Sequence, residues 1–218
     1  MTSAKKKDKI MEGIKHIIFD LGNVILDIDY QLTIDAFEKL GVTDFSSHFS
    51  KQKQSDFMDD FEMGKVSEYE FVDYARPFCN PGTSANQIID AWNALLLDIP
   101  IRRLQILQQL RLDYDLYLLS NTNSIHEKEY NKTVKETCGY ENLNFFFDKV
   151  YLSHRIGMRK PNAEAFTCIL EEHALAPQHT LFIDDSPQHI AAADALGLKT
   201  IHMKDDMSME EDVFKIKN

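Results

Sequence analysis

The sequence has little positive charge for its size. Its 218 residues include 24 Lys and Arg against 35 Asp and Glu, a formal net charge of −11. Nucleic acids and anionic membrane surfaces attract clustered positive charge, so this balance argues against either as a partner. The one locally basic stretch runs from Lys5 to Lys9, and we interpret it as a solvated end.

Cysteines are also few. Cys79, Cys138 and Cys168 are far apart and form no CxxC pair, which fits reduced thiols and gives no sign of a disulfide or zinc site. No apolar stretch approaches the roughly 20 residues that a transmembrane helix needs. No apolar signal segment follows the basic start. We therefore expect a cytoplasmic globular protein.

What the sequence does contain is a series of short apolar runs that end at polar residues. "HIIFD" ends at Asp20, "LYLLSN" at Ser120 and Asn121, and "LFIDD" at Asp184 and Asp185. These runs are continuous rather than alternating, which is typical of parallel strands buried on both faces. "KVYLS" and "LKTIHM" predict two further strands.

Helical patterns separate these strands. Leu104, Leu107 and Leu110 recur at helical spacing, and Ser186 followed by Pro187 is a typical helix start. Strands that alternate with helices predict an α/β fold with a doubly wound, Rossmann-like parallel sheet.

The spacing of the strands also predicts an insertion. About 100 residues separate Asp20 from Ser120, far more than one crossover helix needs. The segment between them has helical patterns, with one expected apolar face formed by Leu32, Ala36, Phe37 and Leu40. We predict an α/β core domain of residues 1–27 and 99–218, and a helical cap domain of residues 28–98.

The polar strand ends should meet, because ligands of open α/β sheets bind outside the carboxyl ends of the strands. Lys160 follows the "YLS" strand and can join the three carboxylates and Ser120 there. Such a set suits phosphoryl transfer. Carboxylates can hold Mg²⁺ together with a substrate phosphate, or one of them can act as a nucleophile.

Each of these residues also has a plainer interpretation. Asp20 could cap a turn, Ser120 could belong to an ordinary loop, and Lys160 could be an exposed lysine. Asp184 and Asp185 could be a turn pair, but adjacent carboxylates repel each other unless a cation offsets them. Four such motifs in this order, each at a strand end, favour a metal-dependent site.

The motifs "FDLGNVILDID", "LLSNTNSIH", "YLSHRIGMRKP" and "FIDDSPQHIAAADALG" resemble those of the haloacid dehalogenase-like hydrolase superfamily. The resemblance covers about Lys15 to Met203, with a helical cap after the first motif. Within the superfamily, these motifs and "FEMGKVSEYEF" are similar to those of the bacterial α-D-glucose-1-phosphate phosphatases.

The resemblance implies a role for each strand-end residue. Asp20 would be the nucleophile, and Lys160 would neutralise the phosphate and orient Asp20. Ser120 and the backbone at Asn121 would hold the phosphate. Mg²⁺ would bind Asp20, the main-chain carbonyl of Gly22 and Asp185, with Asp184 beside it.

Gly22 departs from the superfamily pattern, which places a second Asp at this position. That Asp acts as general acid and base, a role worth roughly 10²- to 10⁴-fold in rate. The protein could be a slow phosphatase, or it could use Asp27, Asp29 or His126 instead. It could also favour good leaving groups, such as the anomeric hydroxyl of glucose 1-phosphate, and the similar phosphatases share this glycine.

Three functions therefore remain open. The first is a Mg²⁺-dependent phosphatase of small phosphorylated metabolites, sugar phosphates above all. The second is a 2-haloacid dehalogenase, which needs no metal and leaves the Asp184–Asp185 pair unexplained. The third is a catalytically idle binding protein, suggested by Gly22 alone. The oligomeric state stays open. We interpret the other histidines, His189 among them, as structural or surface residues. We interpret Trp92 as part of the apolar core of the cap.

Overall fold

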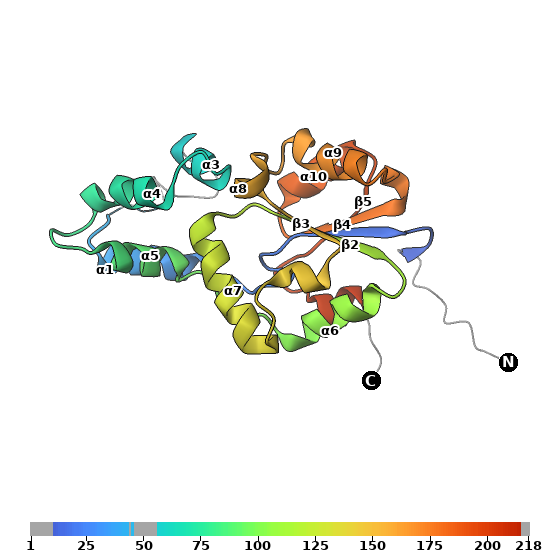
Figure 1. Ribbon diagram of the computed structural model, residues 1–218, viewed down its shortest axis with the longest axis horizontal. Coiled ribbons are helices and arrows are strands. Elements are labelled where there is room, and N and C mark those ends of the chain that lie inside the picture. Colours follow the sequence, from blue (N-terminus) through green and yellow to red (C-terminus); the bar gives the residue numbers. More distant parts are fainter. Residues whose placement is uncertain (1–10, 44, 46–55, 215–218) are drawn as a thin grey trace.

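Five parallel strands form one sheet in the order β3-β2-β1-β4-β5 (Figure 1). The computed structural model describes residues 11–43, 45 and 56–214, so the basic stretch from Lys5 to Lys9 lies outside it. The strands are β1 (His16–Phe19), β2 (Asp115–Ser120), β3 (Lys149–Leu152), β4 (Thr180–Asp184) and β5 (Lys199–His202). The predicted parallel α/β sheet is confirmed, including both strands expected around "KVYLS" and "LKTIHM".

Helices cover both faces of this sheet. Figure 1 shows α9 and α10 on one side of the sheet and α6 and α7 on the other. The helices are α1 (Tyr30–Lys39), α3 (Asp56–Glu62), α4 (Glu68–Ala75), α5 (Ala85–Asn93), α6 (Ile101–Leu110), α7 (Ser124–Cys138), α8 (Ser153–Ile156), α9 (Ala163–Glu172) and α10 (Pro187–Ala195). Shorter helical turns are η2 (Arg76–Phe78), η3 (Leu143–Phe146), η4 (Pro177–His179) and η5 (Met209–Val213).

The continuous apolar runs are explained by burial on both faces of the sheet. In β1, Ile17 and Phe19 belong to the core beneath α6 and α7, whereas Ile18 belongs to the core beneath α9 and α10. Successive side chains of a strand point to opposite faces, so both faces need apolar residues. All three side chains are fully buried.

Helices α1, α3, α4 and α5 share a second apolar core. Its buried aromatic residues include Phe37, Phe61, Phe71 and Trp92, and the Phe61 and Phe71 rings stack at 4.6 Å. Trp92 lies in this core, as the sequence predicts. Ile125 of α7 also belongs to this core, and the cap domain of residues 28–98 stays a prediction.

The face of α1 differs in part from the prediction. Phe37 is buried as expected, but Thr33 occupies the inner face and Leu32 is 38% exposed. The hydroxyl of Thr33 donates to the Trp92 carbonyl oxygen (3.2 Å) and accepts from the Leu95 amide (3.0 Å). The polar Thr33 thus occupies a core position because its hydroxyl joins α1 to the end of α5.

Local sequence sets the limits of the cap helices. Ser67 and Glu70 form a reciprocal capping box at the start of α4, and Ser84 and Gln87 form another at the start of α5. Each box satisfies amide groups that have no partner within the helix.

Two short segments connect the cap to the sheet, and they pair with each other. The Asp27 amide donates to the Asp98 carbonyl and the Leu97 amide to the Asp27 carbonyl, each at 3.0 Å. The Asp29 amide donates to the Leu95 carbonyl at 2.9 Å. The chain therefore leaves the sheet and returns to it at adjacent points.

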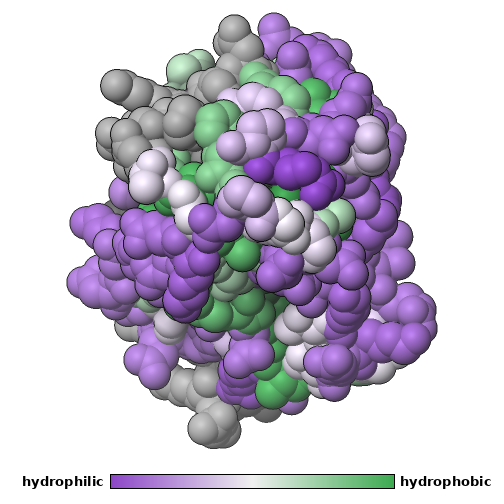
Figure 2. Space-filling view, turned by 90° about the vertical axis from the view of Figure 1, so that its left-hand side faces the viewer, coloured by the Kyte–Doolittle hydropathy of each residue, from purple (hydrophilic) through white to green (hydrophobic). Residues whose placement is uncertain are grey.

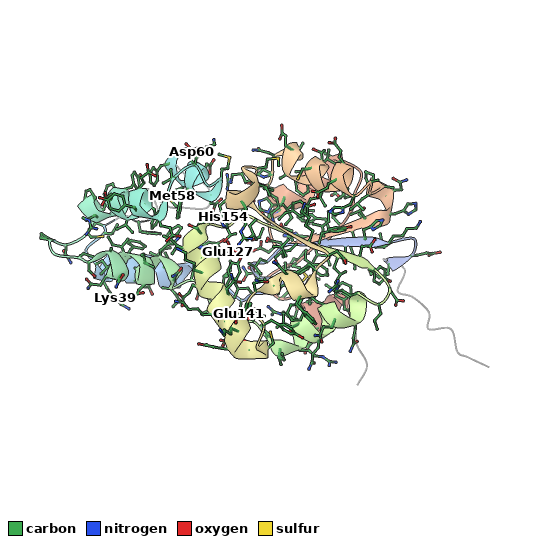
Figure 3. All side chains as sticks on the ribbon, in the orientation of Figure 1. Lys39, Met58, Asp60, Glu127, Glu141 and His154 are labelled. Atoms are coloured by element: carbon green, nitrogen blue, oxygen red, sulfur yellow. The ribbon has the colours of Figure 1, made fainter. Side chains whose placement is uncertain are left out.

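Further contacts join cap and core at α7 and α8. Within the core, Glu127 on α7 accepts from His154 on α8 at 3.0 Å and so joins the two helices that meet the cap (Figure 3). Lys128 pairs with Glu68 of the cap at 2.7 Å. A Cβ at Gly64, in the cap loop before α4, would collide with the His154 carbonyl oxygen, so the loop can approach this closely only as glycine.

Seen from the cap end, the surface is mostly hydrophilic and is interrupted by a narrow band of hydrophobic residues (Figure 2). Among the described residues, none of the helices has the length and apolar character needed to cross a bilayer.

Candidate functional site

Three carboxylates meet at one edge of the sheet. Asp20 follows β1, Asp184 ends the neighbouring β4, and Asp185 comes next in the chain. One oxygen from each of the three lies within 4.8 Å of the others. The sheet topology thus brings together the carboxylates that the sequence analysis selects.

Lys160 joins these carboxylates from the loop after α8. Its side chain is fully buried, and its Nζ lies 2.7 Å from Asp20 Oδ1 and 2.6 Å from Asp184 Oδ2. The Asn121 side chain holds this loop, because Nδ2 donates to the Lys160 carbonyl (2.8 Å) and Oδ1 accepts from the Lys160 amide (2.9 Å). The side chain of Asn121 thus fixes the backbone of the loop that carries Lys160.

Burial and charge shift the pKa of each group. Burial, opposed by Lys160 and reinforced by Asp184 and Asp185, raises the pKa of Asp20 to about 7. Burial also disfavours the charged form of Asp184, but Lys160 and His189 outweigh it and lower its pKa to about 2. Burial acts to lower the pKa of Lys160, and Asp184 and Asp20 more than reverse this, so the ammonium stays charged.

The two neighbouring aspartates have different surroundings. Asp184 is fully buried, and its Oδ1 accepts from the Ser186 amide (2.7 Å) and lies 2.9 Å from His189 Nδ1, while its Oδ2 faces Lys160. Asp185 is half-buried, and its Oδ2 accepts from Asn23 at 3.1 Å. Asp184 is therefore placed to position Lys160, and Asp185 to meet a ligand in the open space.

The charges of the cluster do not balance. Asp20, Asp184 and Asp185 can carry three negative charges when ionised, against one positive charge on Lys160, and burial lowers the pKa of the nearby His189. Buried charge is costly unless it is paired or coordinates a metal. Carboxylate and carbonyl oxygens are the ligands that Mg²⁺ prefers, so the donor set fits that ion.

Ser120 completes the set at the end of β2. It is 3% exposed. The next loop is braced by Ser153, whose hydroxyl accepts from the Thr122 amide and donates to the Thr122 carbonyl, each at 2.9 Å. The loop that would hold a phosphate is thus fixed by hydrogen bonds from the neighbouring α8.

These residues line a cavity of about 460 Å³, called here the polar cavity. Its wall contains Asp20, Gly22, Ser120, Asn121, Lys160 and Asp185, while Asp184 lies behind Lys160. A volume of this size suits a small metabolite.

The wall also contains residues that the sequence analysis missed. They are Tyr30, Asp59 and Glu62 from the cap and Arg159 and His189 from the core. Our interpretation of His189 as a structural or surface residue is incomplete, because it both lines the cavity and pairs with Asp184. One feature of the sequence could have indicated a site role for His189: it lies in the first turn of a predicted helix that starts just after Asp184 and Asp185.

Arg159 connects the cap to the site. It lies next to Lys160 and pairs with Asp59 (2.7 Å) and Glu62 (2.9 Å) on α3. Its side chain is 17% exposed. The cap therefore contributes charged, hydrogen-bonding side chains to the wall of the polar cavity.

Tyr30 is another wall residue from the cap. The residue as a whole is 45% exposed, but burial of its phenol group, followed by the charges of Asp185 and Glu62, raises its pKa well above the usual value. A phenol with a raised pKa is a poor proton donor to a leaving group. Tyr30 is better suited to hydrogen bonding with a ligand.

The alternative acids suggested by the sequence all have other partners. Asp27 pairs with Arg103 at 2.7 Å, and Asp29 caps α1 by accepting from the Gln31 amide at 2.9 Å. His126 uses both ring nitrogens, with Nδ1 3.1 Å from Asn123 and Nε2 3.1 Å from the Trp92 carbonyl oxygen. None of the three lines the polar cavity.

Known proteins are similar to this chain in sequence and in fold. A family model described as haloacid dehalogenase-like hydrolase matches residues 17–203. A D-ribitol-5-phosphate phosphatase from Bacteroides thetaiotaomicron is 31% identical over 211 residues, which cover 94% of this chain and 99% of that protein.

Two solved structures extend the comparison. One is a family enzyme from Bacteroides thetaiotaomicron, with one aspartate replaced by alanine, in complex with magnesium and inorganic phosphate. It is 33% identical with a TM-score of 0.86, and the match covers 93% of this chain and 100% of that one. The other, a hydrolase of the same type from Porphyromonas gingivalis, is 30% identical with a TM-score of 0.81, covering 92% and 96%.

Proposed function

The chain belongs to the haloacid dehalogenase-like hydrolases, and from that premise we propose that it is a Mg²⁺-dependent phosphatase of small sugar or sugar-alcohol phosphates. The observation that carries the proposal is the gathering of three carboxylates around one fully buried lysine at the edge of the polar cavity. This arrangement can receive a divalent cation and a phosphate together.

The residues divide the chemistry among them. The Asp20 carboxylate attacks phosphorus, the bond to the leaving oxygen breaks, and water later hydrolyses the aspartyl-phosphate. Lys160 orients Asp20 and neutralises the phosphate, whose other oxygens bind the Ser120 hydroxyl and the backbone at Asn121. Mg²⁺, when bound by Asp20, the Gly22 carbonyl and Asp185, neutralises negative charge, and Asp184 supports the site by holding Lys160.

Two substrates enter the proposal for different reasons. Gly22 supplies no acid, which favours glucose 1-phosphate because its anomeric oxygen leaves readily. The Bacteroides relative is named for D-ribitol 5-phosphate, a primary ester. Asp59, Glu62, Arg159 and Tyr30 can bind the hydroxyl groups of either substrate.

The alternatives are less well supported. A 2-haloacid dehalogenase uses an aspartate nucleophile without a metal, and it would leave the excess negative charge of the three carboxylates uncompensated. A catalytically idle binding protein would not need a buried lysine paired with the nucleophile. We also propose a cytoplasmic location, because Cys79, Cys138 and Cys168 are all free cysteines.

The test is release of inorganic phosphate from glucose 1-phosphate, ribitol 5-phosphate, glucose 6-phosphate and glycerol 3-phosphate. Each is assayed with excess Mg²⁺ and with a chelator, and 2-chloropropionate serves as the dehalogenase substrate. We expect turnover of at least one of the first two, lost with the chelator and restored by Mg²⁺. Chloride release that survives the chelator would overturn the proposal.

A further inference from the structure

A second cavity of about 280 Å³ adjoins the polar cavity and has a different wall. The two cavities share Gly22, Ile28, Tyr30, Glu62, Ser120 and Asn121, so both open onto the place assigned to the phosphate. Beyond these residues the second cavity is lined mainly by apolar side chains: Leu21, Leu26, Ile34, Trp92, Leu95 and Leu96. We call it the apolar cavity.

Several polar groups in this wall are already engaged. Glu62, which lines both cavities, pairs with Arg159 at 2.9 Å. The Thr33 hydroxyl bonds to the Trp92 carbonyl and the Leu95 amide, and both ring nitrogens of His126 have partners at 3.1 Å. The Thr122 amide bonds to Ser153. A sugar hydroxyl placed here would lose its water partners and gain few in return, at a cost of about 1–3 kcal/mol for each unpaired group. The polar cavity is the better place for a sugar.

We propose that the apolar cavity binds the hydrocarbon portion of a phosphate monoester, so that the site also accepts alkyl phosphates. The proposal rests on the proposed phosphatase function, because the phosphate occupies the same position for both kinds of ester. The organic group then extends either towards Arg159 in the polar cavity or towards Trp92 in the apolar cavity.

The volume sets the size of the hydrocarbon group. An apolar protein cavity of about 150 Å³ holds one benzene molecule, so the apolar cavity should hold on the order of ten carbon atoms. A linear chain of eight carbons fits this limit. Each methylene moved from water into such a cavity should improve binding about three- to fourfold.

Trp92 provides a readout that does not require turnover. It is the only tryptophan of the chain and it lines the apolar cavity. A hydrocarbon group bound there replaces water or empty space beside the indole ring, and the emission of Trp92 should respond. Glycerol 3-phosphate, which is polar throughout, should leave the emission nearly unchanged.

The experiment compares butyl, hexyl and octyl phosphate. Their leaving groups are chemically alike, so differences in rate report binding of the chain rather than the ease of bond cleavage. We expect KM to fall at least about tenfold from butyl to octyl phosphate. In the Asp20→Asn variant, octyl phosphate should shift the Trp92 emission at lower concentration than butyl phosphate.

Neighbouring leucines supply a matched pair of variants. Leu96 lines the apolar cavity, whereas Leu97 is 40% exposed and lies outside its wall. Leu96→Asn should reduce the ratio of octyl to butyl activity several-fold, and Leu97→Asn should leave that ratio unchanged. Because each ratio is taken within one variant, a general loss of activity cancels.

The outcomes separate this proposal from the proposed function. If polar phosphates are hydrolysed but KM does not fall with chain length and the emission does not shift, the apolar cavity does not bind hydrocarbon. If no phosphate ester is hydrolysed but octyl phosphate shifts the emission in the wild-type protein and not in Leu96→Asn, the apolar site stands and the phosphatase proposal fails.

Discussion

Ile28 fills the space beside Gly22. A Cβ placed on residue 22 would lie 2.8 Å from Ile28 Cδ1 and 3.6 Å from its Cγ1. Ile28 belongs to the segment that connects the sheet to the cap, where it bridges to Leu96. The absence of an acid at residue 22 is thus accompanied by an apolar side chain that covers its position.

This contact leads to a prediction about the leaving group. Without an acid, wild-type enzyme should hydrolyse glucose 1-phosphate and aryl phosphates faster than glucose 6-phosphate. Gly22→Asp combined with Ile28→Val, which removes the obstructing Cδ1, should narrow this gap by helping the poor leaving groups most. For glucose 6-phosphate, kcat/KM of the double variant should exceed that of the wild-type enzyme by about tenfold or more. The measurement is kcat/KM for both esters.

Ile28→Val alone is the control, because it opens the space without adding an acid and should not narrow the gap. Gly22→Asp alone should be less stable than the double variant, because its Cβ would lie 2.8 Å from Ile28 Cδ1, an atom that the double variant lacks. Equal turnover of the 1- and 6-phosphates by wild-type enzyme would show that another group already supplies the proton.

Asp184 and Asp185 should differ in what their removal affects. Asp184→Asn leaves the fully buried Lys160 with one carboxylate fewer, and breaking a buried pair in this way costs about 3–5 kcal/mol. Asp185→Asn removes a half-exposed carboxylate and should change stability by less than about 1 kcal/mol. Urea unfolding in a chelator measures both values.

Mg²⁺ binding should show the opposite ranking. Asp185→Asn should weaken binding by more than about 100-fold, and Asp184→Asn by about 10- to 100-fold, because the latter acts through its neighbours. Calorimetric titration measures both constants. Weaker binding by the Asp184 variant than by the Asp185 variant would make Asp184 the direct ligand.

The sequence was sufficient to predict the sheet and the residues at its edge. Strands that are buried on both faces leave a clear apolar pattern, and parallel strands must bring their carboxyl ends to one edge. Asp20, Ser120 and Asp184 could therefore be placed together although they lie in three different parts of the chain. Lys160 could be added because it follows a predicted strand.

The cap wall could not be predicted in the same way. Arg159 pairs with Asp59 across 100 residues of sequence, and no periodic pattern reports a contact between two domains. His189 shows no spacing typical of metal ligands in the sequence, because it acts on Asp184 across the first turn of a helix. The apolar cavity was also hidden, since its leucines are part of patterns that predict ordinary core.

Asp20→Asn should abolish turnover. An amide cannot form the aspartyl-phosphate, so we expect kcat to fall by more than about 10³-fold. The side chain keeps its shape, and Lys160 keeps its contact with Asp184 at 2.6 Å, so the variant should remain folded. Phosphate release and circular dichroism on the same sample are the measurements. A folded variant with substantial activity would remove Asp20 from its assigned role.

His126 joins the two domains through a buried network. It stacks on Trp92 with ring centroids 5.0 Å apart and bonds to Asn123 and to the Trp92 carbonyl oxygen. In this arrangement Nε2 donates to the Trp92 carbonyl, and Nδ1 accepts from the side-chain Nδ2 of Asn123. The ring is therefore neutral. Burial lowers the pKa of His126 to about 4, and the bond to Trp92 opposes this only in part.

His126 should therefore make the fold sensitive to acid. Its pKa is about 4 when folded and about 6.5 when unfolded, so the unfolded chain binds the proton more readily between these values. Stability is unaffected above pH 6.5 and falls as the pH drops from there towards 4, by about 2 kcal/mol between pH 7.5 and pH 5. His126→Gln keeps a donor for the Trp92 carbonyl but cannot titrate, so it should lose about 2 kcal/mol less over the same interval. Urea unfolding at both pH values measures the difference, and parallel losses in the two proteins would show that His126 is not the titrating group.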